Sequence, residues 1–148
     1  MQEALSKVLF SSEKTEWETP GWLFNELDRE FGFNLDVCAT KENAKYDMYF
    51  SPEDDGLSQD WMGLTCWMNP PYGREIGDWI KKAYEESLQG ATVVCLLPAR
   101  TDTAWFHEYI YEQAEIRFLR GRLRFDGANN SAPFPSMVVV FREEEGLK

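Results

Sequence analysis

Cys66-Trp67-Met68-Asn69-Pro70-Pro71-Tyr72 is the stretch that decides the fold, because an apolar run ends there at an amide, two prolines and a phenol. Proline fixes its own φ and has no N–H, so the backbone cannot pair onward as a central strand. A residue before a proline is held extended, which gives the carbonyl of Pro70 a nearly fixed direction. The stretch therefore predicts a strand over residues 64–68 that ends at an Asn-Pro-Pro-Tyr box.

The box also has the groups needed for chemistry on an amine. The amide oxygen of Asn69 and the carbonyl of Pro70 can both accept hydrogen bonds from one amino group, which stabilises a transition state through preorganised acceptors. Tyr72 offers a ring on which a planar base can stack, a contact worth roughly 1–3 kcal/mol per base. A bare four-residue match also fits a proline turn with a packed tyrosine, so the surrounding sequence has to decide.

Ahead of the box, the pattern predicts a helix from about residue 20 to residue 31. Thr19 is expected to be its N-cap, and Gly32 its C-cap. The expected apolar stripe consists of Trp22, Leu23, Leu27 and Phe31. Trp17, just outside the helix, fits either a hydrophobic staple or a lid on a ligand.

A short buried strand is expected over residues 33–39, and it carries an acid, Asp36, near its C-terminal end. A buried charge needs a partner or solvent. In open α/β sheets ligands bind outside the carboxyl ends of the strands, so Asp36 lies where a ligand amine or hydroxyl can reach it. Because no glycine-rich GxGxxG loop follows the strand, a ligand without phosphates is preferred.

Beyond the box, strands and helices alternate. We expect helices over 74–88 and 103–112, a central parallel strand over 91–97, and strands over 46–50, 114–119, 123–125 and 137–141. This order predicts an α/β three-layer mixed sheet with a C-terminal antiparallel hairpin. The length of 148 residues fits one domain, with residues 1–15 as a loose arm.

Composition excludes several classes of protein. No apolar run is long enough to span a membrane, and the N-terminus lacks a signal-peptide core, so we expect an intracellular, cytoplasmic protein. The cysteines Cys38, Cys66 and Cys95 have neither metal-binding nor disulfide-like spacing, and buried free thiols are expected. Residues 54, 55 and 60 are aspartates in a turn-rich loop, where solvated acids are common.

The net charge of -11 argues against a protein that binds nucleic acid over its whole surface. The charge is uneven, however, since residues 1–99 carry eight basic and eighteen acidic side chains and residues 100–148 carry seven and eight. Arginines at 117, 120, 122 and 124 fall within eight residues without an acid. They predict either a local basic patch or a set of solvated arginines at a strand edge.

Taken in order, five groups of residues resemble the phage-type, Dam-like DNA adenine-N6 methyltransferases. They are Trp17-Glu18-Thr19-Pro20, Leu35-Asp36-Val37-Cys38-Ala39, Asp55-Gly56-Leu57 with Asp60-Trp61, the box itself, and Gly121-Arg122-Leu123 with Ala132-Pro133-Phe134-Pro135-Ser136. The resemblance implies a Rossmann-like fold, S-adenosylmethionine as the methyl donor, and transfer to the N6 amine of adenine in DNA by a phage or prophage enzyme.

The resemblance also implies roles for individual residues. Asp36 would hold the methionine amino group of the donor, Asp55 the ribose and Asp60 the cofactor adenine, with Trp17, Thr19 and Ala39 shaping the pocket. The box of Asn69, Pro70, Pro71 and Tyr72 would be catalytic: Asn69 and Pro70 bind the target amine, and Tyr72 stacks on an adenine that is flipped out of the duplex or unpaired. Candidate DNA contacts are Arg74, Arg100, Arg122 and Arg124.

This chemistry needs no metal and little general base, because the methylated aminium formed is acidic. The single histidine, His107, is therefore expected to be a surface residue. The chain has no room for a large recognition domain, so a partner, a dimer or the loop 126–135 would supply sequence specificity, and a sheet of reduced strand number is expected. Three alternatives stay open: methylation of RNA adenine, methylation of protein glutamine, and a non-catalytic nucleic-acid-binding module with this fold.

Overall fold

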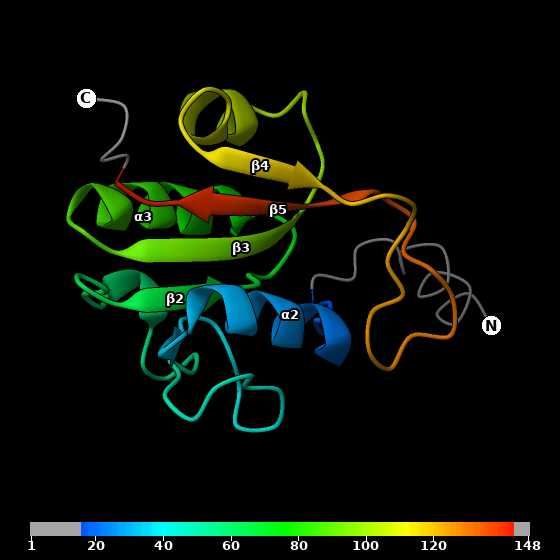
Figure 1. Cartoon of the computed structure of the whole chain (residues 1–148), viewed down its shortest axis with the longest axis horizontal. Helices are drawn as coiled ribbons and strands as arrows, with labels where there is room; N and C mark the ends of the chain where they lie inside the picture. Colours follow the sequence, from blue (N-terminus) through cyan, green and yellow to red (C-terminus); the bar gives the residue numbers. More distant parts are fainter. Residues whose placement is uncertain (1–15, 144–148) are drawn as a thin grey trace, which may run out of the picture.

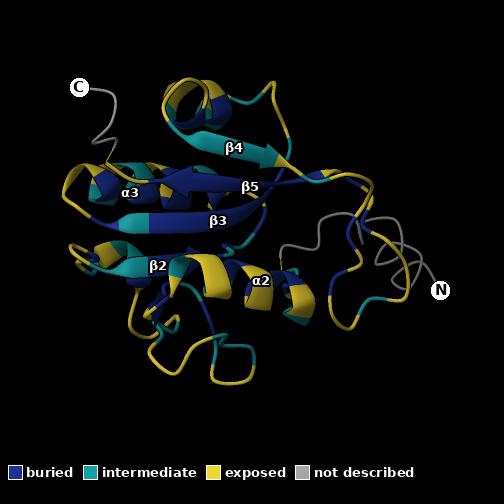
Figure 2. Cartoon of the chain, viewed as in Figure 1, coloured by how far each residue is buried: buried dark blue, intermediate teal, exposed yellow. Residues whose placement is uncertain are grey.

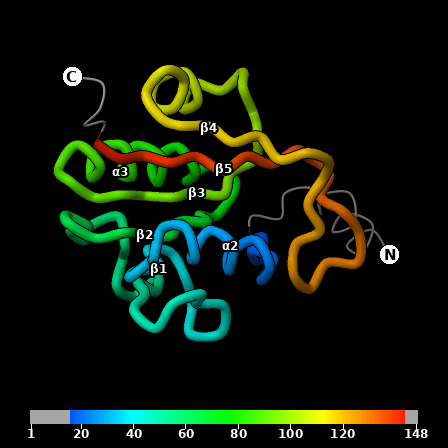
Figure 3. The backbone as a smooth tube through the Cα atoms, viewed as in Figure 1, coloured from blue at the N-terminus to red at the C-terminus, as the bar shows by residue number. Residues whose placement is uncertain are grey.

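A five-stranded sheet forms the centre of the computed structural model, which describes residues 16–143; the expected arm over 1–15 lies outside them. The strands are β1 (Leu35–Asp36), β2 (Thr65–Met68), β3 (Thr92–Pro98), β4 (Glu115–Phe118) and β5 (Ser136–Phe141). Their order across the sheet is β1-β2-β3-β5-β4 (Figures 1 and 3). The first three strands are parallel, and β5 is antiparallel to both β3 and β4.

Helices cover both faces of the sheet, as the three-layer prediction requires. Helix α2 (Gly21–Phe31) lies in front of β2 in the view of Figure 1, and α3 (Ile76–Leu88) lies behind the strands. Each helix turns an apolar side to the sheet: Phe24 of α2 contacts the ring of Trp67 on β2, and Ile80 and Ala83 of α3 are fully buried. The expected α/β layering is confirmed.

The core follows the two central strands. Every residue of β5 is buried, and in β3 only Thr92 is partly exposed (Figure 2). Such continuous Val and Leu runs are typical of strands covered on both faces. The predicted central strand is therefore confirmed, although one of its two neighbours, β5, is antiparallel.

Helix α2 differs in detail from its prediction. Pro20 occupies the N-cap position, so the expected Thr19 cap is wrong, and the Thr19 hydroxyl binds elsewhere. Trp22 is 57% exposed, and Phe24 takes its place in the buried stripe beside Leu23 and Leu27. The C-cap is confirmed: Gly32 has φ 68° and donates its N–H to the carbonyl of Asp28.

The segment after β3 is less regular than its sequence pattern suggests. The helix expected over 103–112 contains a five-residue π-helix, Phe106–Ile110, and the strand expected over 123–125 is wrong. In its place, residues 119–135 form a long loop between β4 and β5. Leu123 and Phe125 are buried and alternate with exposed arginines because the loop packs on the core, without pairing in the sheet.

The other boundaries shift by a few residues. Helix α3 begins at Ile76 rather than at residue 74, and the expected strand over 46–50 is a single parallel bridge between Asp36 and Tyr49. The cysteines are free thiols, with Cys66 and Cys95 buried and Cys38 half-buried. None of the helices within residues 16–143 is long and apolar enough to cross a membrane.

Candidate active site

The carboxyl ends of the parallel strands meet at one edge of the sheet, beside a cavity of about 620 Å³. Asp36 ends β1 and Asn69 follows β2, and both line this cavity. The remaining walls come from residues 16–19, the loops 38–45 and 50–57, the start of α3, and residues 126–127. Ligand pockets commonly measure about 300–1,000 Å³, so the cavity is large enough for a nucleoside-sized molecule.

Asp36 is a buried carboxylate, only 2% exposed. Its two oxygens accept the backbone N–H groups of Cys38 (3.3 Å) and Lys45 (3.0 Å). Burial outweighs these bonds and raises the pKa of Asp36 from 3.8 to about 6. A pKa raised this far corresponds to a free-energy cost of about 3 kcal/mol for the ionised form, which a cationic ligand group in the cavity would offset.

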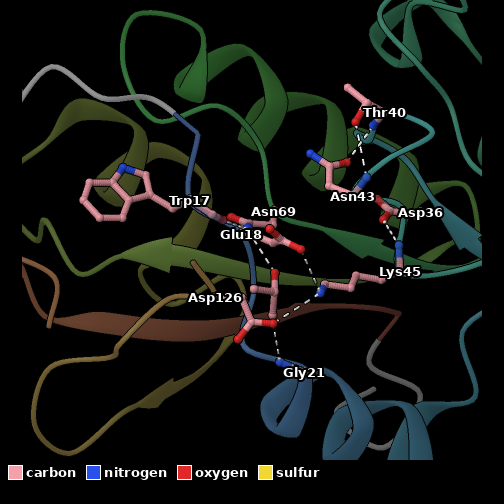
Figure 4. Close-up of polar contacts among 10 residues, drawn as sticks. Trp17, Glu18, Gly21, Asp36, Thr40, Asn43, Lys45, Asn69 and Asp126 are labelled. Atoms are coloured by element: carbon pink, nitrogen blue, oxygen red, sulfur yellow. Dashed lines mark hydrogen bonds and ion pairs between the residues drawn. The ribbon is translucent and has the colours of Figure 1, made fainter. Parts of the chain in front are cut away.

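Asn69 presents its amide with a fixed orientation. The Nδ2 group donates to the carbonyl of Trp17 and to Oγ1 of Thr19, 2.9 Å away (Figure 4). The Oδ1 atom is buried and has no hydrogen-bond partner among the described residues. Leaving a buried acceptor unpaired costs about 1–3 kcal/mol. Such an atom is explained if a ligand that binds in the cavity donates a hydrogen bond to it.

The rest of the box divides between the cavity and the core. Pro70 and Pro71 line the cavity next to Asn69. Tyr72 does not line it: its ring is 3% exposed, lies 5.7 Å from the ring of Phe134, and its hydroxyl donates to the carbonyl of Leu96 (3.0 Å). In this conformation, therefore, the ring expected to stack on a base is covered by the loop 119–135.

The residues expected to bind the cofactor are mostly brought together. Trp17, Thr19, Ala39 and Asp55 line the same cavity as Asp36. The ring of Trp17 packs on Phe125 and Phe134, 5.2 and 5.1 Å away, which places it against the loop 119–135. Asp60 is not in the lining; its carboxylate accepts the N–H of Met62 (2.8 Å).

The sequence interpretation missed a polar cluster over the cavity. Lys45 Nζ lies 3.8 Å from Glu18 Oε1 and 3.9 Å from Asp126 Oδ2, and Asp126 also accepts the N–H of Gly21 (Figure 4). The cluster joins the segment before α2, the loop after β1 and the loop after β4. No local motif marks it, because its members come from three distant parts of the chain.

Trp79 is a second cavity residue that the sequence interpretation did not single out. It lines the cavity from α3, and its indole Nε1 has no hydrogen-bond partner among the described residues. Its ring also lies against Gly56, where an added Cβ would come within 2.3 Å of the carbonyl of Val37 and 3.0 Å of the Trp79 ring. Only glycine fits at this position, which carries the backbone of the neighbouring Asp55 against the end of β1.

The predicted basic patch contains fewer unpaired arginines than the sequence suggests. Arg117 binds both oxygens of Glu30 (2.7 Å each) and one of Glu115 (2.6 Å), so it is a structural residue. Arg74, Arg100 and Arg122 are exposed, and Arg100 lies over the ring of Phe134. Arg124 is exposed but donates from Nε to the carbonyl of Ala128 (3.0 Å).

His107 is exposed and lies away from the cavity lining, with Nε2 2.7 Å from the carbonyl of Thr101. Within the described part of the chain, no group of three or more His, Cys, Asp or Glu side chains is placed to hold a metal ion. The site is therefore built from one buried carboxylate, one oriented amide and the carbonyl groups around them.

In this mixed α/β sheet, one parallel strand ends in a buried acid and the next ends in an Asn-Pro-Pro-Tyr box, and the two ends share a cavity. This arrangement is that of a Rossmann-like methyltransferase. The family model described as DNA N-6-adenine-methyltransferase (Dam) matches residues 6–146. The chain belongs to this family.

Two curated relatives support the assignment. The DNA N-6-adenine-methyltransferase of Haemophilus phage HP1 is 36% identical over 141 residues, an alignment that covers 88% of this chain and 80% of the phage protein. The protein of the same name from Escherichia phage T1 is 34% identical over 132 residues, covering 88% of this chain and 55% of the relative.

Proposed function

We propose that this protein transfers a methyl group from S-adenosylmethionine to the exocyclic N6 amine of adenine in DNA, using the cavity at the carboxyl edge of the sheet. One observation carries the proposal: a buried carboxylate, Asp36, and an unpaired amide acceptor, Asn69 Oδ1, line the same cavity. The first suits the ammonium group of the donor, and the second suits the amine that is to be methylated.

The donor side of the cavity fits a zwitterionic nucleoside. When bound, S-adenosylmethionine supplies an electrophilic methyl group on a sulfonium. Asp36 is held by two backbone N–H groups and is positioned to pair with the amino group of the methionine part. Asp55, exposed at the rim of the cavity, is our candidate for the ribose hydroxyls, with Trp17, Thr19 and Ala39 shaping the walls. Asp60 has weaker support because it lies outside the lining.

The acceptor side needs positioning more than acid–base catalysis. Asn69 Oδ1 and the Pro70 carbonyl accept the two hydrogens of the target amine, which directs its nitrogen lone pair toward the methyl group. The aminium formed is acidic and loses its proton to solvent water without a strong base. This agrees with a lining that contains no histidine among the described residues.

The target adenine has to leave the duplex, or be presented unpaired, to reach Asn69. Tyr72 would then stack on it after the loop 119–135 moves away from its ring. We assign phosphate contacts to Arg74, Arg100 and Arg122, and a weaker one to Arg124 because it already binds Ala128. A local patch is needed because the net charge of -11 opposes DNA binding elsewhere on the surface.

The test is methyl transfer from labelled S-adenosylmethionine to three acceptors: adenine-containing DNA, RNA of the same sequence and a glutamine-containing protein. We expect label on DNA adenine N6 and a loss of at least 100-fold with Asn69→Ala, while binding of S-adenosylhomocysteine is retained. Transfer to RNA alone or to protein glutamine alone would show that this acceptor, and not DNA adenine, is the substrate. Donor binding without transfer to any acceptor, in the wild type, would favour a non-catalytic binding module.

A further inference from the structure

The orientation of the Asn69 amide is set from outside the box. Its Nδ2 group donates to the Trp17 carbonyl and to Thr19 Oγ1, both in the segment that precedes α2. A backbone carbonyl can only accept a hydrogen bond, so the amide nitrogen must face it. A flipped amide would place Oδ1 against the Trp17 carbonyl, which cannot donate, and would turn the N–H groups toward the target amine. The segment therefore selects the productive orientation.

Thr19 has a second group available. A hydroxyl offers one O–H donor besides its lone pairs. Oγ1 of Thr19 accepts from Asn69 at 2.9 Å, and its O–H has no acceptor among the described residues. The residue is only 2% exposed, yet it lines the cavity. A buried O–H without a partner is costly, so an acceptor atom of the cavity's occupant is the group that it lacks.

We infer that Thr19 is a positioning residue that links the donor cavity to the acceptor amide. It holds the Asn69 amide through Oγ1 and donates its O–H to an anionic oxygen of the bound methyl donor, the carboxylate of its methionine part. The inference rests on the proposed function for the nature of the occupant. A hydroxyl that donates becomes a better acceptor, with a gain of about 10–30% per bond in a hydrogen-bond chain. Occupancy of the cavity thus tightens the hold on Asn69.

Kinetics of two matched variants test the link. Thr19→Val keeps the shape and removes both hydrogen bonds, whereas Thr19→Ser keeps the hydroxyl. We expect Thr19→Val to lower kcat for DNA methylation about fivefold, since one hydrogen bond is worth about 1 kcal/mol, with the KM for DNA little changed. Thr19→Ser should recover most of that rate. Thr19→Val with wild-type kcat would overturn the inference.

A direct readout follows Asn69 itself. In protein labelled with 15N-asparagine, the side-chain amide signal of Asn69 is assigned by its loss in Asn69→Ala. We expect saturating S-adenosylhomocysteine to shift this signal in the wild type, and the shift to be lost in Thr19→Val even when the ligand is bound. A shift that persists in Thr19→Val would show that the ligand reaches Asn69 by another route and would refute the link.

The same signal gives a test without any substitution. 5′-Methylthioadenosine keeps the nucleoside of the donor but lacks its carboxylate, so it should bind without shifting the Asn69 signal; an equal shift would refute the inference. The two proposals fail differently. A wild type that binds no S-adenosylhomocysteine and methylates nothing refutes the proposed function, whereas an active wild type matched by Thr19→Val refutes only the role of Thr19.

Discussion

Asp36 in the wall of the cavity and Tyr72 outside it each allow a single-residue test of the proposed site. Asp36, which we propose binds the methyl donor, is a buried carboxylate, and Tyr72, which we propose stacks on the target base, has its ring buried in the core. The contacts within the protein compensate the burial of Asp36 only in part, and those of Tyr72 hold its ring away from the cavity.

Asp36 should make the ligand-free protein less stable as pH rises. Because its pKa is about 6 when folded and near 3.9 when unfolded, the folded state binds more protons between these values. The free energy of unfolding contributed by this group therefore falls as pH rises from about 4 to 6, by up to about 3 kcal/mol.

Urea unfolding of the wild type and of Asp36→Asn, at several values from pH 4 to 7, measures this contribution. The difference between the two curves is informative, because Glu30, whose pKa is lowered mainly by its hydrogen bond to Arg117, acts in the opposite direction in both proteins. A difference that stays constant with pH would mean that Asp36 does not titrate in this range.

Tyr72 allows its hydroxyl and its ring to be separated. Tyr72→Phe removes the bond to the Leu96 carbonyl and should lower the free energy of unfolding by about 1 kcal/mol, while methylation persists because the ring remains. Tyr72→Ala should lose both stability and activity. Thermal unfolding and labelled-methyl transfer check the pair; an inactive Tyr72→Phe of normal stability would give the hydroxyl a role in the reaction.

Among the elements, the loop 119–135 connects most of the unexplained features. It covers the Tyr72 ring with Phe125 and Phe134, packs on Trp17, and carries the exposed Arg122. Movement of this loop on contact with DNA would uncover the ring of Tyr72. The loop can therefore couple DNA binding to exposure of the box. We therefore propose the loop as a source of target recognition.

The arginines provide a matched pair for DNA binding. Arg122→Ala should weaken DNA binding and reduce the slope of log affinity against log salt by about one, the value for a single phosphate contact. Arg117→Ala removes the same charge but breaks the pairs with Glu30 and Glu115, so it should lower stability and leave the slope unchanged. Fluorescence anisotropy over a salt series distinguishes them. Equal slopes for Arg122→Ala and the wild type would exclude this contact.

Elements with strong local signals were predictable from sequence, whereas those defined by distant contacts were not. Pro70 and Pro71 end β2, Gly32 ends α2, and the Val-Leu run marks β3, because each effect is local to the backbone or to burial on both faces. The strand expected over 123–125 has the right alternation, but its Phe125 packs on the rings of Tyr72 and Phe134 and the segment does not pair in the sheet.

The candidate site shows the same division. Asp36 and Asn69 were predictable because parallel strands bring their carboxyl ends to one edge. The contacts of Lys45 and of the Thr19 hydroxyl were not, since the partners of both residues lie many positions away in the chain.

Considered as a whole, residues 16–143 share one continuous hydrophobic core that extends from α2 through the sheet to α3. We propose that the chain folds as the single domain expected from its length. Circular dichroism, which follows the helices, and tryptophan fluorescence, which follows Trp61 and Trp67 in the core, should give coincident urea transitions. Two separated transitions would indicate more than one folding unit.

The reversed direction of β5 has a practical consequence for fusion proteins. Because β5 runs antiparallel to β3, its last residue, Phe141, pairs with Val93 at the edge opposite the cavity (the two ends of the sheet are seen in Figure 1). The segment ahead of α2, in contrast, passes directly over Asn69. A reporter or programmable DNA-binding module joined directly after β5 would leave the chain at the edge away from the cavity, whereas one joined directly before Trp17 would start beside Asn69, the residue that we propose binds the target amine.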